Sequence, residues 1–214
     1  KSNSLVVLEL SSFQLQDLTR SPKIAVVLML TSEHLDYHRD IKEYVDAKRN
    51  MLRFQGPSDY AILNRDYPAS NESNIHTQAQ VYYVSRKRGV ERGCFLRDGT
   101  IWIKDTGGEK RVIYVKDITI VGKHNYENVC AASMAAYLAG VSITNIAKVL
   151  REFKGLEHRL ELIRTVNGAR YYDDSFSTTP ETAIAAIEAF DAPEILILGG
   201  SSKNSDFSEL GRVI

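Results

Sequence analysis

The sequence predicts an α/β fold with a mostly parallel sheet, and three patterns lead to this expectation. Two short apolar runs, residues 5–10 and 24–30, have the length and composition of buried strands. Helix-forming segments follow them, which gives the strand–helix–strand order of a parallel sheet. The dipeptide Asp98-Gly99 lies between two further strand-like segments and predicts a tight hairpin. We therefore expect a small antiparallel patch within the sheet.

A helix should begin near residue 40 and direct a lysine toward the end of the second strand. Asp40 and Glu43 have the spacing of a capping box at a helix start. Tyr44 and Lys48 are one helical turn apart and therefore share a face. The helix should aim Lys48 back at the strand end.

The next elements continue the alternation of strands and helices up to residue 155. Residues 60–63 and 81–84 have the composition of strands. An alanine-rich helix should run to about residue 139 and end at Gly140, because glycine readily adopts a left-handed C-cap. Residues 143–153 should form another helix.

Residues 156–214 should begin a second domain. Asn167-Gly168 predicts a hairpin, and Thr179-Pro180 has the capping side chain and first-turn proline of a helix start. Residues 194–198 should form a strand before Gly199-Gly200, and a helix followed by a strand is typical of the opening of a Rossmann-like fold. This segment has too few strands to close a two-sided sheet, so we expect the domain to be incomplete.

The composition indicates a globular protein, and its charge balance favours either a small-molecule site or no binding site at all. Of the 214 residues 43% are apolar, and Lys plus Arg equals Asp plus Glu at 27 each. No net basic charge is available to attract nucleic acid or anionic lipid, and the longest apolar runs are too short to cross a bilayer. Cys94 and Cys130 match neither a metal motif nor a disulfide framework, which favours the cytoplasm. We expect neither a nucleic-acid nor a membrane partner.

Chemically active side chains gather beyond the second expected strand. Glu33, His34 and Asp36 follow it directly, where open α/β sheets bind ligands, and Lys48 should face them. The alternative is that Glu33, Asp36 and His38 only solvate a loop.

Glu9 and the pair Ser11-Ser12 follow the first expected strand. A carboxylate suits Mg²⁺, and hydroxyls beside it can bind a substrate carboxylate or phosphate. Alternatively, the acid only caps the next helix.

Later segments have side chains suited to a nucleotide. Asn125 and Asn128 can offer an adenine edge both a donor and an acceptor, although asparagine is also common at helix starts. Arg159 and Asp174 could bind ribose and phosphates, or form a hinge salt bridge. Lys203, after a glycine turn, suits a carboxylate.

These motifs, in this order, resemble the Mur ligase family over the whole chain. The resemblance implies a P-loop-type ATPase central domain over residues 1–155, incomplete at its beginning, and the start of a Rossmann-like, amino-acid-binding domain over residues 156–214. The Ser-Ser-Phe-Gln sequence after Glu9 favours the branch that adds D-glutamate. The matching motifs are Glu9-Leu10-Ser11-Ser12-Phe13-Gln14-Leu15, Glu33-His34-Leu35-Asp36, Lys48, residues 122–128, His158-Arg159, Asp174-Ser175, and Gly199-Gly200 with Lys203.

The resemblance also implies a reaction. Members of the family use ATP to convert a carboxylate into an acyl phosphate, which the nitrogen of an amino acid attacks to form an amide. The substrates here would be UDP-N-acetylmuramoyl-L-alanine, D-glutamate and ATP, in the cytoplasmic synthesis of peptidoglycan precursors that cell-wall formation, cell shape and cell division require. The enzyme would be a monomer.

The resemblance assigns roles to individual residues. Glu9 would bind one Mg²⁺ shared with the nucleotide phosphates, and His34 with Lys48 would bind a second. Because an ammonium group repels a cation, Lys48 would carry a carbamate formed with carbon dioxide. Catalysis would rest on these three residues. The nucleotide would contact Asn125, Asn128, Arg159 and Asp174, and the other substrates would contact Ser11, Ser12, His34, Thr178 and Lys203.

Two features depart from the family pattern. Phe176 stands where the family usually has a lysine, which removes a cation from the phosphate region. The Gly-x-x-Gly-Lys-Thr/Ser loop that the family places upstream of Glu9 does not occur in the chain. We therefore expect the chain to be part of a longer enzyme and to be inactive alone.

Two other functions stay open. A folylpolyglutamate synthase-like ligase would use similar ATP and lysine chemistry, although the sequence after Glu9 speaks against it. A non-catalytic nucleotide-binding remnant would explain the missing phosphate loop.

Overall fold

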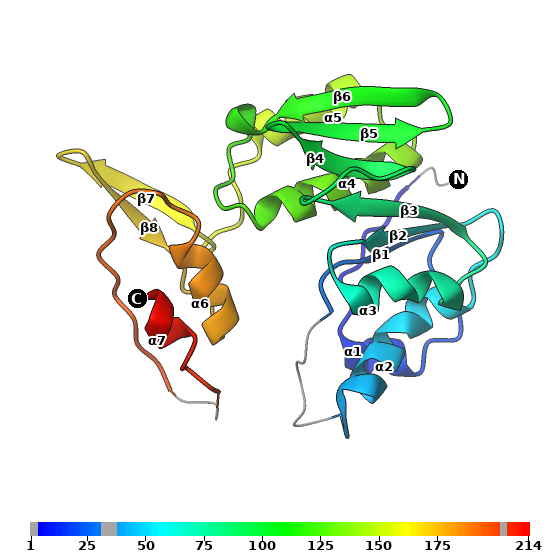
Figure 1. Ribbon diagram of the computed structural model, residues 1–214, viewed down its shortest axis with the longest axis horizontal. Helices are drawn as coiled ribbons and strands as arrows, with labels where there is room; N and C mark the ends of the chain where they lie inside the picture. The colour runs from blue at the N-terminus through cyan, green and yellow to red at the C-terminus, as the bar shows by residue number, and fades with distance from the viewer. Residues whose placement is uncertain (1–3, 31–37, 202–204) are drawn as a thin grey trace.

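The computed structural model describes residues 4–30, 38–201 and 205–214. Its main feature is a six-stranded sheet in the order β1-β2-β3-β4-β5-β6 (Figure 1). The pairings from β1 to β4 are parallel, and those from β4 to β6 are antiparallel. A mostly parallel sheet with an antiparallel patch is therefore confirmed. The strands are β1 Ile24–Val27, β2 Tyr60–Asn64, β3 Gln80–Ser85, β4 Gly93–Arg97, β5 Thr100–Asp105 and β6 Gly108–Tyr114.

Helices cover both faces of this sheet (Figure 1). Ala61 and Leu63 of β2 pack in one buried cluster with Leu52 of α2, whereas Ile62 packs in another with Met134 of α4. Side chains alternate between the faces of a strand, so burial of both faces explains the continuous apolar runs. No helix among the described residues is long and apolar enough to cross a membrane. The helices of this part are α1 Ser12–Gln16, α2 Ile41–Arg53, α3 Pro68–Asn71, α4 Asn125–Leu138 and α5 Ile143–Glu152, with two 3-10 helices, η1 Glu72–His76 and η2 Val115–Asp117.

Both predicted hairpins form. Asp98 and Gly99 have positive φ angles of 48° and 67° between β4 and β5, as a type I′ turn requires. Asn167 and Gly168, with φ angles of 49° and 83°, join β7 and β8 in the same way. Strand β6, which extends the antiparallel patch by one strand, was not predicted.

The start of α2 differs in detail from the prediction. The Asp40 carboxylate accepts a hydrogen bond from the Glu43 backbone N–H at 2.8 Å, as expected of an N-cap. The Glu43 carboxylate, however, accepts from the backbone N–H of Arg39 at 2.8 Å and from the Arg39 side chain at 3.0 Å. The cap is therefore present, but the reciprocal capping box is not.

Two expected strands do not form. Residues 5–10 and 194–198 run without regular secondary structure, and their apolar side chains are exposed, to 95% at Val7 and 97% at Ile195. Neither segment pairs with a strand of the described chain. An isolated extended segment leaves its backbone groups to water, so apolar composition alone cannot make it a strand.

A smaller part follows the six-stranded sheet. Its two-stranded sheet is separate from the larger one and lies apart from it in Figure 1. The capping box of Thr179 and Thr182 opens α6, as the Thr179-Pro180 pair predicts. The domain boundary near residue 155 and the incompleteness of both domains stay predictions. The elements are β7 Glu161–Val166, β8 Ala169–Asp173, α6 Pro180–Ile187 and α7 Leu210–Val213.

The two cysteines, distant in sequence, meet in the core. Cys94 on β4 and Cys130 on α4 are both free and buried. Burial, and then the hydrogen bond with Cys130, raises the pKa of the Cys94 thiol well above its usual value. Both cysteines are therefore packing residues of the interface between α4 and the sheet.

Candidate functional site

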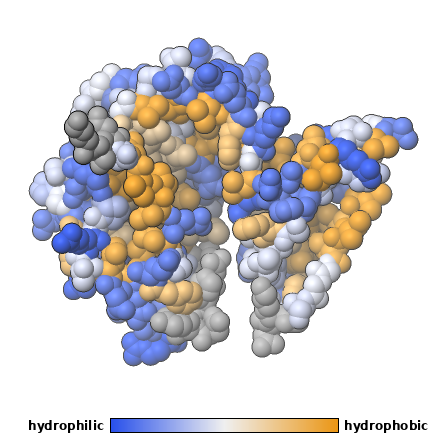
Figure 2. Space-filling view, turned by 180° about the vertical axis from the view of Figure 1, so that it is seen from behind, coloured by the Kyte–Doolittle hydropathy of each residue, from blue (hydrophilic) through white to orange (hydrophobic). Residues whose placement is uncertain are grey.

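A cleft between the larger and the smaller part brings several predicted residues together. Figure 2 shows the surface hollowed between the two parts. The cavity there has a volume of about 190 Å³. Asn128, Arg159 and Asp174, which are distant in sequence, all line it. The other lining residues are Leu28, Met29, Tyr67, His124, Glu127, Leu160, Ser177, Thr179, Glu181, Thr182, Ala185 and Ala186.

The two asparagines at the start of α4 have different surroundings. Asn125 donates through its side-chain amide to the Val121 carbonyl at 2.6 Å, and its own amide oxygen accepts from Asn128 at 3.0 Å. Only Asn128 lines the cavity, and its side chain is exposed. Asn125 therefore orients Asn128, while Asn128 has the free access that a ligand needs.

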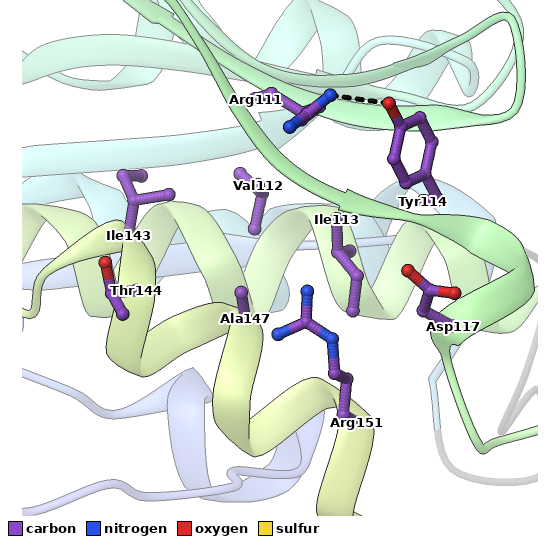
Figure 3. A pocket seen from close by; sticks show the side chains of 9 residues that line it. All are labelled: Arg111, Val112, Ile113, Tyr114, Asp117, Ile143, Thr144, Ala147 and Arg151. Atoms are coloured by element: carbon purple, nitrogen blue, oxygen red, sulfur yellow. Dashed lines mark hydrogen bonds between the residues drawn. The ribbon is translucent and has the colours of Figure 1, made fainter.

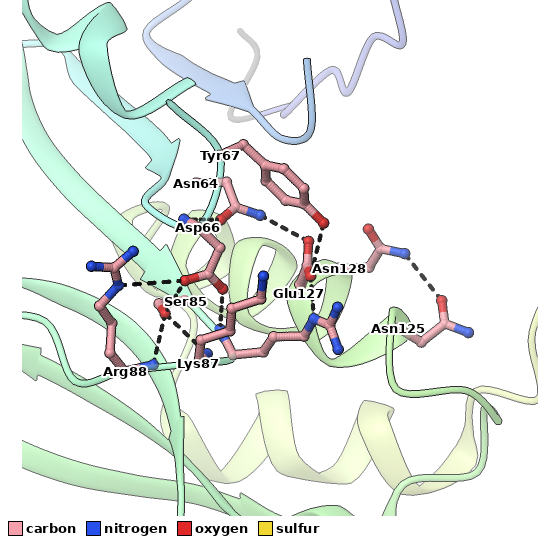
Figure 4. A network of polar contacts seen from close by, with 10 residues as sticks. Asn64, Asp66, Tyr67, Ser85, Lys87, Arg88, Asn125, Glu127 and Asn128 are labelled. Carbon is pink, nitrogen blue, oxygen red and sulfur yellow. Dashed lines mark hydrogen bonds and ion pairs between the residues drawn. The ribbon is translucent and has the colours of Figure 1, made fainter. Parts of the chain in front are cut away.

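Glu127, on the same helical turn, is the centre of a buried polar network (Figure 4). Its side chain is only 8% exposed. The carboxylate accepts hydrogen bonds from the Asn64 amide at 2.9 Å and the Tyr67 hydroxyl at 3.1 Å, and it pairs with the Arg86 guanidinium. The network ties α4 to the carboxyl ends of β2 and β3, which fixes the cavity wall.

The segment that connects the two parts carries Arg159 into the cleft. Its neighbours His158 and Leu160 both have left-handed backbone angles, with φ of 63° and 44°. Such angles are unfavourable for these residues, and they persist when surrounding contacts impose them. Here the Leu160 N–H donates to Asp174 Oδ1 at 2.9 Å, and the Phe176 N–H donates to the His158 carbonyl at 3.0 Å. The end of β8 thus holds the connection in place.

His158 and Asp173 form an ion pair beside this connection. His158 Nδ1 lies 2.8 Å from Asp173 Oδ2, while Ser175 donates to the other carboxylate oxygen. The hydrogen bond to Asp173, and then its charge, raises the pKa of His158 above its ordinary value of 6.5. The same hydrogen bond from His158, followed by those from Ser175, lowers the pKa of Asp173 to about 2.

We expect replacement of His158 by asparagine to lower stability in mildly acidic but not in alkaline solution. Asparagine tolerates the left-handed backbone but is too short to keep the ion pair. Because the folded-state pKa of His158 is raised, its contribution is fully present below pH 6.5 and is lost as the pH rises through the folded value. Thermal unfolding of both proteins between pH 5 and 9 measures this; a difference that grows with pH would contradict it.

The other predicted cluster lies around α1 and α2. Lys48 is half-buried, and its Nζ donates to the Leu10 carbonyl at 3.4 Å, so the lysine reaches the segment that carries Glu9. The Glu9 side chain is exposed. His34, like Glu33 and Asp36, lies outside the described residues, as does Lys203.

The predicted substrate residues have mixed surroundings. Ser11 caps α1: its hydroxyl accepts from the Gln14 N–H at 3.4 Å, and Gln14 Oε1 accepts from the Ser11 N–H at 2.9 Å. Ser12 is buried, and its hydroxyl lies 2.9 Å from Nε2 of the buried His38. Thr178 is exposed and does not line the cleft, although its neighbours Ser177 and Thr179 do.

A larger cavity lies elsewhere, between β6 and α5 (Figure 3). It measures about 310 Å³, and its lining includes the apolar side chains of Val112, Ile113 and Ala147. Arg111 lines it but donates to the Tyr114 hydroxyl at 2.5 Å. It contains none of the predicted site residues, so the smaller cleft is the better candidate.

A third group has the composition of a metal site. Ligand atoms of His158, Glu161 and Asp173 lie within 4.8 Å of one another. The hydrogen bonds that support the connecting segment already explain their proximity: His158 pairs with Asp173, and Glu161 accepts from the His158 N–H at 2.8 Å. These residues are not the predicted metal ligands.

Tyr67, Glu127 and His38 were not predicted as site residues. A signal for Glu127 was present, because it lies between Asn125 and Asn128 on one helical turn. Tyr67 follows the end of β2, at the edge where ligands bind in such sheets. His38 lay in the motif that contains His34, but only the fold shows its contact with Ser12.

Comparison with known proteins gives consistent results. The family described as Mur ligase middle domain matches residues 1–136. UDP-N-acetylmuramoylalanine--D-glutamate ligase of Acetivibrio thermocellus is 41% identical over 214 residues, which is 100% of this chain and 46% of that protein. The enzyme of the same name from Thermoanaerobacter sp. (strain X514) is 39% identical over 208 residues, 97% of this chain and 46% of that protein. The chain thus spans about half the length of the curated relatives it matches.

Solved structures support the fold. MurF from Acinetobacter baumannii superposes with a TM-score of 0.64 at 22% identity, over 83% of this chain and 38% of that one. A structure named UDP-N-acetylmuramoyl-L-alanyl-D-glutamate--2,6-diaminopimelate ligase gives a TM-score of 0.62 at 22% identity, over 84% and 38% of the two chains. At this identity the likeness concerns the fold alone.

Proposed function

The chain belongs to the Mur ligase family, and from this we propose that it forms the nucleotide- and metal-binding part of an ATP-dependent ligase that adds D-glutamate to UDP-N-acetylmuramoyl-L-alanine. The observation that carries the proposal is the cleft, where Asn128, Arg159 and Asp174 meet from separate segments. The names of the relatives at about 40% identity support D-glutamate as the amino acid. They favour this reaction over that of a folylpolyglutamate synthase.

The cleft has groups for each portion of ATP. The Asn128 amide offers a donor and an acceptor for adenine, and the Asp174 carboxylate can accept from ribose hydroxyls through the oxygen not bonded to Leu160. The Arg159 guanidinium can form charged hydrogen bonds with the phosphate oxygens. Because these groups come from both parts, a bound nucleotide would hold the parts together and help to exclude water from the acyl phosphate.

The described residues around Lys48 fit a divalent cation if the lysine carries a carbamate. The lysine reaches the segment of Glu9, whose exposed carboxylate is a hard oxygen ligand. An unmodified ammonium there would repel a metal, whereas a carbamate would add an anionic oxygen. We assign Glu9 to one Mg²⁺ and His34 with carbamylated Lys48 to a second. Bound Mg²⁺ would stabilise charge on the transferred phosphate.

Substrate contacts follow from the same assignment. We assign Ser11 and Ser12 to the muramoyl substrate, together with His34, and Thr178 with Lys203 to the D-glutamate carboxylates. Asn125 acts on adenine through Asn128, to which it is hydrogen bonded. The use of ATP and a nucleotide-linked precursor suggests a cytoplasmic enzyme, and we propose that it acts as a monomer.

A chimera tests the function directly. This chain would replace the 214 matched residues of the Acetivibrio thermocellus ligase, with the unaltered ligase assayed in parallel. We expect ADP release that requires both UDP-N-acetylmuramoyl-L-alanine and D-glutamate. Activity with a pteroate and glutamate instead would favour the folate branch, and no activity beside an active parent would favour a non-catalytic remnant.

In this chimera we expect Lys48→Ala to lower kcat about a hundredfold or more, because an anionic ligand near the transferred phosphate is lost. Lys42→Ala is the matched control: Lys42 lies on the same helix, but its side chain is 86% exposed and pairs with Asp46 on the helix surface. Native mass spectrometry in bicarbonate should show the mass of one added carbon dioxide, absent in Lys48→Ala. Equal activity of the two variants would exclude a catalytic role for Lys48.

A further inference from the structure

Tyr67 lies in the wall of the cleft, and none of the roles above involves it. It follows the carboxyl end of β2, and its side chain is half-buried. Figure 4 shows Tyr67 and Asn128 near the same turn of α4, with the Glu127 carboxylate close to the phenol hydroxyl. An aromatic ring therefore stands beside the amide that we assign to the base.

Glu127 fixes the orientation of this ring. The Tyr67 hydroxyl donates to Glu127 Oε1 at 3.1 Å, while Asn64 holds the other carboxylate oxygen at 2.9 Å and Arg86 balances the charge. Burial, and then the nearby Glu127 charge, raises the pKa of Tyr67 to about 12. The phenol therefore remains a hydrogen-bond donor at neutral pH, and the ring is held before any ligand arrives.

The remaining walls leave room for a flat ligand. Ala185 and Ala186 of α6 line the cleft with side chains of a single methyl group, and Leu28 and Leu160 add apolar surface. A planar base between an aromatic ring and small apolar groups gains stacking and dispersion energy. A purine gains more than a pyrimidine because its two fused rings cover more of the phenol.

We propose that Tyr67 is a base-stacking residue that gives the cleft its preference for purine nucleotides, and that Glu127 is the positioning residue that holds the ring in place. This inference rests on the proposed function, because it takes a nucleotide to be the ligand of the cleft. It adds a source of base selectivity that Asn128 alone does not provide, since an amide can also pair with a pyrimidine edge.

Calorimetric titration of the 214-residue chain with ADP and with CDP tests the proposal. Tyr67→Leu keeps an apolar side chain but removes the ring, and we expect it to weaken ADP binding about tenfold and CDP binding about threefold or less. Tyr67→Phe keeps the ring and removes only the bond to Glu127, so its ADP affinity should stay within about threefold of wild type. Thermal unfolding of each variant verifies that it is folded.

The outcomes separate this inference from the proposed function. If wild-type protein binds ADP but Tyr67→Leu binds it equally well, the stacking role is wrong while the nucleotide site stands. If Tyr67→Leu loses affinity for ADP and for CDP by the same factor, Tyr67 does not give the cleft a preference for purines. If wild-type protein binds neither nucleotide, the proposed function and this inference both fail. In the chimera, Tyr67→Leu should raise the KM for ATP about tenfold and leave kcat and the KM for D-glutamate within about twofold.

Discussion

Replacement of Gly93 by alanine should prevent the larger part from folding stably. Gly93 begins β4 with a φ of +145°, which an alanine rarely adopts. A Cβ atom there would lie 1.7 Å from the Tyr83 carbonyl oxygen and 2.7 Å from the Tyr83 nitrogen. These are backbone atoms of the neighbouring strand, which cannot move without breaking the β3–β4 pairing between Tyr83 and Gly93. We expect a loss of more than about 4 kcal/mol in the free energy of unfolding.

Urea denaturation followed by circular dichroism measures this loss. Gly89→Ala is the matched control, because the nearest atom to a Cβ there is a Phe95 ring carbon at 3.9 Å. That contact is ordinary, so the control should change stability by no more than about 1 kcal/mol. A Gly93→Ala protein as stable as the control would show that β3 and β4 do not approach as closely as described.

Replacement of Glu127 by alanine should cost about 3 kcal/mol of stability. The change leaves the Arg86 guanidinium without its partner and removes the acceptor of the Asn64 amide, which is fully buried. The figure is at the lower end for a broken buried pair because the Arg86 side chain is 30% exposed and can reach water. ADP binding should weaken by no more than about threefold, as for Tyr67→Phe, because both changes remove the hydrogen bond that orients the Tyr67 ring.

Glu109→Ala provides the comparison for Glu127. Glu109 also pairs with an arginine, Arg97 at 2.6 Å, but the two side chains are 30% and 43% exposed. Breaking an exposed pair should cost much less than breaking the buried one, because water solvates the charge that is left behind. Chemical denaturation of both variants gives the two values, and equal values would mean that burial of Glu127 does not add to the cost.

The sequence correctly predicted those elements whose formation depends on only a few neighbouring residues. Asp98-Gly99 and Asn167-Gly168 tolerate positive φ angles and mark their hairpins wherever they occur. β6 was not predicted because its first residues, Gly108, Glu109, Lys110 and Arg111, have the composition of a loop. The pairing of β6 with β5 explains why charged residues occur in this strand. Glu109 lies opposite Lys104 on β5, and the two side chains form a salt bridge at 3.5 Å.

The failed strands show the limit of apolar composition. Residues 5–10 and 194–198 have the side chains of buried strands, yet a strand also requires a neighbour to accept and donate its backbone hydrogen bonds. Whether such a neighbour is present is a property of the whole assembly of strands. Composition within a short window therefore predicts which segments are able to form a strand, but not which of them do so.

The sequence by itself determined the class of fold, the hairpins, the helix starts at Asp40 and Thr179, and the chemical types available for a nucleotide site. These depend on backbone preferences and side-chain chemistry within a few residues. Only the tertiary structure decided that Asn128, Arg159 and Asp174 share one cleft, that Asn125 does not line it, and that Tyr67 is held by Glu127. Distances between residues far apart in the chain depend on how strands pair and helices pack, which no local pattern encodes.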